Sequence, residues 1–235
     1  MILALQYLAL IACAISAVVR TPAALRGRGL PLWTCFALMT VSVALSIPDI
    51  YGPVDDALGG INVANVILRT ALYIVFCALG IAISKTFDSM HVEWLISGRP
   101  GLWALGLAMG LTFCVFALGG GAGGDLDTST PAGLIYGMTW RFYLAYVAVC
   151  LLVMLLPVAF DARRRDVYRW SAALLAIGFA LVCIMPFAMM AALIGGGEET
   201  LVKIISYSSI LFVAAGLGMV WFAGRRARRE LAEAV

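Results

Sequence analysis

Two arginines, Arg69 and Arg141, lie well inside long apolar runs of the sequence, at 62–84 and 133–159. At 1.5 Å per helical residue, both would lie about 10–12 Å below the surface of a bilayer. A guanidinium group at that depth costs a few kcal/mol unless it faces a partner or water, and it cannot lose its proton. We therefore expect both side chains to point into a helix bundle, where they could bind an anion.

Other polar residues gather at about the same depth as the two arginines. They lie on one helical face of the third apolar run, in the first part of the seventh, and at the end of the second. The opposite halves of these runs are mostly Leu, Val, Ala, Phe and Met. The pattern predicts a polar, net cationic pocket that opens outward and takes a small anionic solute. The candidate ligand-binding residues are Arg69, Arg141, Asn65, Tyr73, Lys203, Tyr207 and Asp49.

The same residues also have a purely structural interpretation. Arg69 and Arg141 could pair with Asp49, Glu198 or Glu199 and only fix the positions of helices. Ser, Thr and Asn side chains often form hydrogen bonds between membrane helices without binding any ligand. The residue types leave both interpretations open.

Several kinds of chemistry have no residues to support them. His91 is the single histidine, and the six cysteines lie in apolar runs without C-x-x-C spacing. Neither a bis-histidine haem site nor a Ser–His–Asp or Cys–His pair can be assembled within the apolar runs. We expect no enzymatic activity, no cofactor, no metal site and no nucleic-acid partner.

The elements that position these residues are apolar and long. The chain is 63% hydrophobic and 12% charged, whereas a soluble domain carries about 25% charged residues. Unbroken apolar runs of about 20 residues are typical of transmembrane helices. We expect an all-α membrane protein, a bundle of seven transmembrane helices forming one domain over 1–224, followed by a short basic tail, 225–235. The runs are 2–19, 31–48, 62–84, 102–118, 133–159, 170–194 and 201–223.

The charges between the runs predict an orientation in the cell membrane. Thirteen of the 16 Lys and Arg residues lie in the first, third and fifth connections and the tail, while the other connections carry mostly Asp and Glu. Basic segments stay in the cytoplasm. The N-terminus is therefore expected outside and the C-terminus inside.

One segment supports a resemblance to a known group. The order Pro-Asp-Ile-Tyr…Asp-Asp-Ala-Leu-Gly-Gly over 48–60, followed by Asn62-Val63-Ala64, resembles a group of actinobacterial seven-helix membrane proteins of unassigned function, often described as candidate transporters. The resemblance covers about 1–225 by layout but rests on the motifs of this one segment. Arg69 stands where that group is expected to have a histidine, so no site residue is carried over.

Two functions of different class follow from these patterns. The first is a transporter or receptor that handles a small anion in the predicted pocket. The second is a non-catalytic membrane subunit or scaffold that packs against a partner complex. Gly106 and Gly110 form a G-x-x-x-G pattern, which permits close packing of helices within the bundle or between copies in a homo-oligomer.

Overall fold

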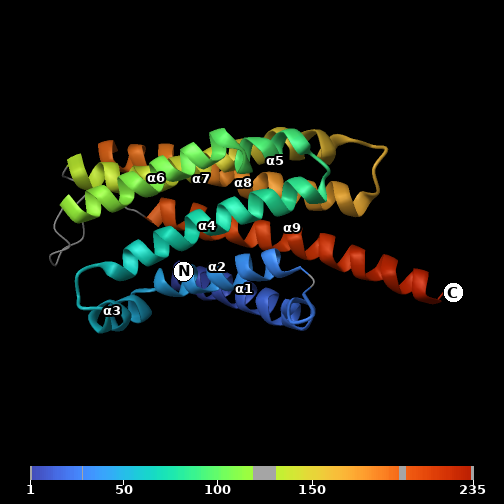
Figure 1. Ribbon diagram of the computed structural model, residues 1–235, viewed down its shortest axis with the longest axis horizontal. Coiled ribbons are helices and arrows are strands. Elements are labelled where there is room, and N and C mark those ends of the chain that lie inside the picture. The colour runs from blue at the N-terminus through green and yellow to red at the C-terminus, as the bar shows by residue number, and fades with distance from the viewer. Residues whose placement is uncertain (1, 28, 119–130, 196–199, 234–235) are drawn as a thin grey trace.

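A computed structural model describes residues 2–27, 29–118, 131–195 and 200–233, with only the backbone described from residue 223 onward. Over these residues the chain is all-helical, as expected (Figure 1). The helices are α1 (Ile2–Ala24), α2 (Leu30–Leu45), α3 (Pro48–Ala57), α4 (Val63–Thr86), α5 (Met90–Ser97), α6 (Arg99–Leu118), α7 (Pro131–Phe160), α8 (Asp166–Gly195) and α9 (Thr200–Glu233).

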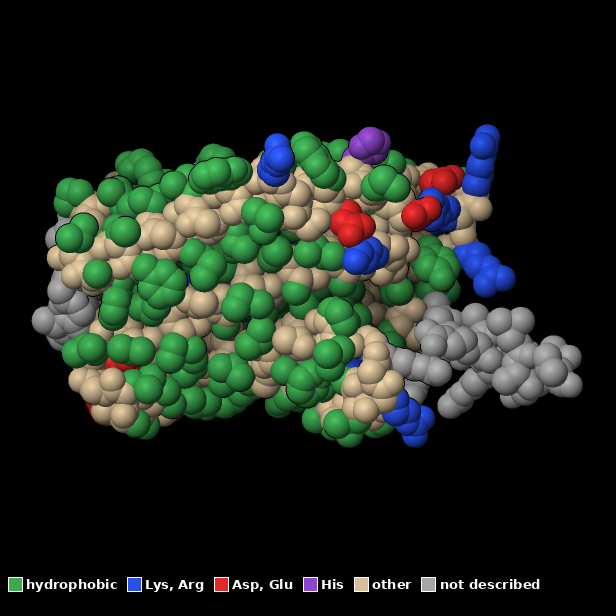
Figure 2. Space-filling view, viewed as in Figure 1, with side chains coloured by type: hydrophobic (Ala, Val, Ile, Leu, Met, Phe, Trp, Pro, Cys, Tyr) green, Lys and Arg blue, Asp and Glu red, His purple; other side chains and the backbone are tan. Residues whose placement is uncertain are grey.

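The chain is a polytopic membrane protein. Six stretches of helix are long and apolar enough to cross a bilayer, and the count rises to seven if the bent pair α2 and α3 is taken as one span. Large apolar side chains such as Trp103, Phe142 and Phe187 lie exposed on the outside of the helices. Figure 2 shows apolar side chains over the length of the bundle, the surface that lipid tails would contact.

The second span is shorter than the sequence pattern suggests. Helix α2 has 16 residues, about 24 Å of helix, against a hydrocarbon core of about 30 Å. The chain then bends by 94° into α3. Pro48 begins α3 at a position where its missing N–H is not needed. Helix α3 therefore lies across one end of the bundle (Figure 1), which we call the α3 end.

Six helices form a closed ring. Helix α1 packs against α2 and α9, α2 against α4, α4 against α7, α7 against α8, and α8 against α9. Helix α6 packs on α4 and α7 from outside this ring, and the short helix α5 precedes it. Gly106 and Gly110 of α6 have no atom within 4 Å of an added Cβ, so the G-x-x-x-G pattern faces away from the bundle.

The two ends of the ring differ in charge. The exposed Lys85 lies in the last turn of α4, and the exposed Arg163 and Arg164 follow the last turn of α7, so all three lie at the end opposite α3, which we call the basic end. Figure 2 shows Lys and Arg side chains at that end. Lys85 pairs with Glu93 at 3.4 Å, and Arg164 with Asp161 at 3.9 Å. The acids of the fourth and sixth connections, which support the predicted orientation, lie outside the described residues; they are Asp125, Asp127, Glu198 and Glu199. Helix α9 continues through the basic segment to Glu233.

Close packing of α8 on α9 depends on two glycines. A Cβ on Gly178 would lie 2.8 Å from Val213 Cγ2, and one on Gly216 would lie 2.7 Å from Leu175 Cγ. Contacts this short force neighbouring side chains or backbone to move. The glycines thus set the distance between the two helices that close one side of the ring.

We expect Gly216→Ala to lower the stability of the protein by about 1–3 kcal/mol, the usual cost of overpacking a tight contact. The matched control is Gly218→Ala, because a Cβ at Gly218 meets no atom within 4 Å. Thermal unfolding of the detergent-purified variants measures the difference. Equal melting temperatures for the two variants would show that this contact is not tight.

Candidate ligand pocket

The segment between α2 and α4 folds into a cap for α4. Asp55 Oδ2 accepts the backbone N–H of Asn62 at 3.1 Å, and Oδ1 accepts that of Ala64 at 3.1 Å. Tyr51 Oη donates to Asn62 Oδ1. Gly59 and Gly60 turn the chain with positive φ angles of 103° and 67°. The segment that carries the family resemblance therefore holds the first turn of α4, the helix that presents Asn65 and Arg69.

A carboxylate at a helix N-terminus satisfies backbone donors and interacts favourably with the helix dipole. We expect Asp55→Ala to destabilise the protein by about 1–2 kcal/mol for this reason. Asp56→Ala is the control, since Asp56 is the adjacent acid and is exposed. Thermal unfolding in detergent checks the prediction. A melting temperature lowered equally by both variants would argue for a general charge effect instead of a cap.

Arg69 links α4 to α7. Its Nε donates to Asn65 Oδ1 at 2.9 Å and its Nη1 donates to the carbonyl of Tyr136. The guanidinium carbon lies 3.5 Å from the centre of the Tyr136 ring and 6.0 Å from that of Trp140. Within the part of the chain that the structure describes, Arg69 forms no ion pair with an acid. The guanidinium charge is thus stabilised by the Tyr136 carbonyl, the Asn65 amide and the faces of two aromatic rings.

A cavity of about 240 Å³ lies inside the helix ring. Five helices of the ring, α2, α4, α7, α8 and α9, contribute to its wall. On α9 the lining runs from Val202 to Val213, which places the cavity in the half of the bundle nearer the α3 end. Apolar residues make up most of the wall: Met39, Val43, Leu68, Leu72, Phe76, Leu79, Trp140, Leu144, Val182, Met185, Met189, Val202, Ile210 and Val213.

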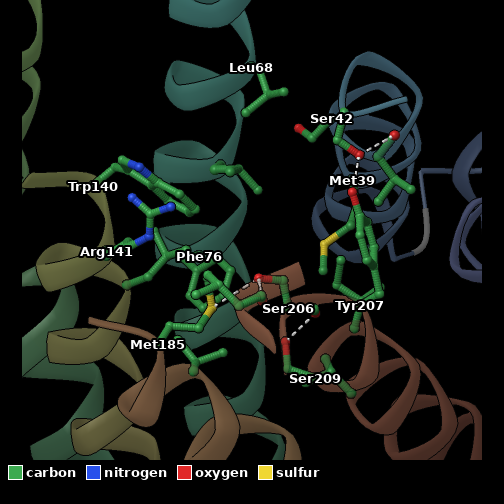
Figure 3. A pocket seen from close by; sticks show the side chains of 18 of the residues that line it. Met39, Ser42, Leu68, Phe76, Trp140, Arg141, Met185, Ser206, Tyr207 and Ser209 are labelled. Atoms are coloured by element: carbon green, nitrogen blue, oxygen red, sulfur yellow. Dashed lines mark hydrogen bonds between the residues drawn. The ribbon is translucent and has the colours of Figure 1, made fainter. Parts of the chain in front are cut away.

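The charged side chains among the described residues that line the cavity are both cations, Arg141 and Lys203. Arg141 Nη1 donates to the carbonyl of Gly137 on its own helix, and the guanidinium carbon lies 4.5 Å from the centre of the Trp140 ring. Figure 3 shows Arg141 and Trp140 on one side of the cavity, with Ser42 and Tyr207 on the opposite side. Lys203 lies exposed in the first turns of α9.

A row of hydroxyl groups forms the polar side facing Arg141. Gln6 Nε2 donates to Tyr207 Oη at 2.8 Å, and Tyr207 Oη donates to Ser46 Oγ at 2.9 Å. Ser46 Oγ in turn donates to the carbonyl of Val43 at 2.6 Å. This row connects α1, the end of α2 and α9, so it fixes the wall of the cavity at the α3 end.

The remaining lining serines also donate to carbonyls of their own helices. Ser42 Oγ donates to Leu38 at 2.9 Å, Ser206 Oγ to Val202 at 2.7 Å, and Ser209 Oγ to Ser206 at 2.7 Å. Ser206 Oγ also lies within hydrogen-bond distance of Met185 Sδ, at 3.6 Å. Each of these hydroxyl groups thus already has an acceptor within the protein. An anion in the cavity would therefore be drawn to Arg141 and Lys203, with the serine oxygens left as acceptors.

The structure brings together three of the seven candidate residues, since Arg141, Lys203 and Tyr207 line the cavity. Asn65 and Arg69 pair with each other beside Tyr136 and do not line it. Tyr73 is fully buried and its Oη lies 2.8 Å from Thr112 Oγ1 on α6. Asp49 is exposed in the first turn of α3.

Sequence reasoning missed the contributions of α2 and α8. Ser42 on α2 and Ser46, the residue that caps its C-terminus, are spaced four residues apart and both line the cavity, a helical repeat that is visible in the sequence. Met39, Met185 and Met189 carry no polar signal that separates them from ordinary core residues. They are soft, adaptable side chains that suit a wall against which a ligand body packs.

No group of His, Cys, Asp and Glu residues within the described chain is placed to hold a metal ion. The six cysteines are free thiols. No family model, curated protein or solved structure matches the chain. The residues and shape of the cavity are therefore the basis on which a function is proposed.

Proposed function

We propose that the protein binds a small organic anion in the cavity at the centre of the ring. The observation that supports this most is the presence of two cations, Arg141 and Lys203, in a wall whose other described residues are neutral. A cation in a partly desolvated site attracts an anion more strongly than it would in water. The proposed function is binding or translocation of that anion by a polytopic membrane protein.

The wall also limits the kind of anion. Most of its residues are apolar, so a ligand with a hydrocarbon body would gain free energy by leaving water for the cavity. Drug-sized ligands occupy pockets of about 300–1,000 Å³, and the volume here is about 240 Å³. A small carboxylate with a short apolar body meets both conditions, and benzoate and hexanoate are simple probes of that class.

The proposal includes an orientation. Basic residues cluster at the end opposite α3, and such residues stay in the cytoplasm. The N-terminus and the α3 end then lie outside, the C-terminus lies inside, and the cavity lies in the outer half of the bundle. The solute would reach Arg141 and Lys203 from outside the cell.

A stability assay tests the ligand class. Detergent-purified protein would be melted with benzoate, hexanoate, sulfate and the zwitterion glycine betaine. A ligand that binds only the folded state stabilises it by about 2.7 kcal/mol at 100 times its dissociation constant. We expect benzoate or hexanoate to raise the melting temperature. If no carboxylate does so at millimolar concentration, the proposal is wrong, and a scaffold that packs against another membrane protein becomes the better hypothesis.

A further inference from the structure

Arg20 is a buried cation at the basic end of the ring. The charge pattern alone places it in the connection after the first apolar run, but α1 continues past it to Ala24. Its side chain is 6% exposed. Nη2 donates to the carbonyl of Leu217 on α9 at 3.3 Å. The guanidinium carbon lies 4.5 Å from the ring centre of Phe36 on α2 and 5.9 Å from that of Trp221 on α9.

One hydrogen-bond donor of the Arg20 guanidinium has no acceptor among the described residues. Its Nη1 is buried and has no hydrogen-bond partner there, and none of the ion pairs there includes Arg20. A buried charge without an acidic partner is costly, and it is more often found at functional sites than in passive packing. The two aromatic rings offset only part of that cost.

A continuous row of apolar side chains connects Arg20 to the cavity. A void of about 10 Å³ lies next to the cavity and shares part of its wall, including Met39 and Val213. Phe36 and Leu217 line the same void, and both also contact the Arg20 guanidinium. The full lining of the void is Cys13, Cys35, Phe36, Met39, Val75, Leu79, Ile210, Val213, Ala214 and Leu217.

This row runs along α9, on the side of the ring formed by α1, α2 and α4, over most of the thickness of a bilayer's hydrocarbon core. Lys203 and Leu217 are fourteen residues apart on α9, which corresponds to about 21 Å along the helix. The hydrocarbon core of a bilayer is about 30 Å thick. The row thus has cations at the cavity and a third cation, Arg20, at the basic end. Between them lie the side chains that line the void, which we call the apolar septum.

We infer that this row marks a closed path for the anion that the cavity binds, and that Arg20 is the second anion-binding group on it. The inference rests on the proposed function and extends it from binding to translocation. In the closed form, Phe36 and Trp221 cover the guanidinium and the septum excludes water. In the open form, α2 and α9 separate at these rings, and Nη1 of Arg20 receives the anion that has left Arg141.

The native Cys35 can report on the septum. Its thiol is buried and lines the void one residue from Phe36. The experiment treats detergent-purified full-length protein with the anionic thiol reagent 2-sulfonatoethyl methanethiosulfonate and follows each cysteine by peptide mass spectrometry. We expect slow labelling of Cys35 in the wild type. Arg20→Gln should raise that rate about tenfold, because loss of the cation–π contacts favours the open form.

Two controls separate opening of the path from loosening of the whole fold. Cys150 is buried on α7 and lines neither space, so its labelling should stay unchanged in Arg20→Gln. Arg26→Gln, an exposed arginine six residues further along the chain, should leave Cys35 unchanged. Saturating benzoate should slow the labelling of Cys35 in Arg20→Gln by occupying the path.

Each outcome bears on a different claim. An unchanged Cys35 rate in Arg20→Gln, or an equal rise at Cys35 and Cys150, would overturn the path while leaving benzoate binding at Arg141 untouched. If benzoate fails to stabilise the wild-type protein at all, the proposed function itself is wrong. A rise confined to Cys35 and slowed by benzoate is the result that supports the inference.

Discussion

Replacing Arg141 with glutamine is expected to weaken carboxylate binding by about 10- to 100-fold, because a hydrogen bond to a charged group contributes about 1.5–3 kcal/mol. Arg141 lies beside Trp140 on the cavity wall, where a glutamine would keep much of the side-chain volume but lose the charge. Titration of wild-type and variant protein with benzoate, followed by melting temperature, measures the change. Arg141→Lys should retain part of the affinity, since it keeps the charge without the planar guanidinium.

Lys203 provides an internal comparison for this prediction. Its side chain is exposed, whereas that of Arg141 is half-buried, so solvent screens its charge more strongly. Lys203→Gln should therefore weaken binding less than Arg141→Gln. Arg163→Gln, which removes an exposed cation at the basic end, should leave the affinity unchanged. Equal effects of all three variants would indicate a diffuse charge effect and no defined site.

Replacing Arg69 with methionine is expected to destabilise the protein by about 3 kcal/mol, from the loss of charge-assisted hydrogen bonds and a partly buried cation–π contact. Arg69 is the link between Asn65 on α4 and Tyr136 on α7, and methionine keeps its length and apolar stem. The affinity of the remaining folded protein for benzoate should change little, because Arg69 does not line the cavity. Thermal unfolding and benzoate titration of the same sample provide both readouts.

This pair of predictions separates the two intramembrane arginines. Arg141→Gln should act mainly on affinity and Arg69→Met mainly on stability. A loss of benzoate affinity in Arg69→Met as large as that in Arg141→Gln would contradict the assignment. It would show that the anion reaches Arg69, as the pattern of polar residues first suggested.

Much of the fold could be predicted from the sequence, because a membrane leaves few alternatives. Backbone groups in hydrocarbon must be paired within a helix, so each apolar run had to become one. Six of the seven expected runs lie largely within one long apolar helix each, whereas the second run is divided between α2 and the start of α3, so the described helices provide six or seven spans. The 94° bend after α2 was harder to predict, since Pro48 is compatible both with the end of a span and with the start of a new helix.

The site was less predictable than the fold. Helical spacing placed Asn65 and Arg69 on one face, and the structure shows them hydrogen-bonded. The spacing of residues within one helix does not show which neighbouring helix a face contacts. In the structure, this face of α4 contacts the backbone and ring of Tyr136 on α7. Arg20 was assigned to a connection for a similar reason, because only the closure of the ring brings α1 against α9 and buries that side chain.

Equilibrium binding of radiolabelled benzoate to purified wild-type protein and to Arg141→Gln tests whether the cavity is an anion site. We expect saturable binding at one site per chain in the wild type and an affinity lower by about tenfold or more in the variant. The variant must first show a cooperative thermal transition, so that lost binding is not lost folding. Absence of saturable binding in the wild type, or equal affinity in both proteins, would contradict the assignment of the cavity as an anion site.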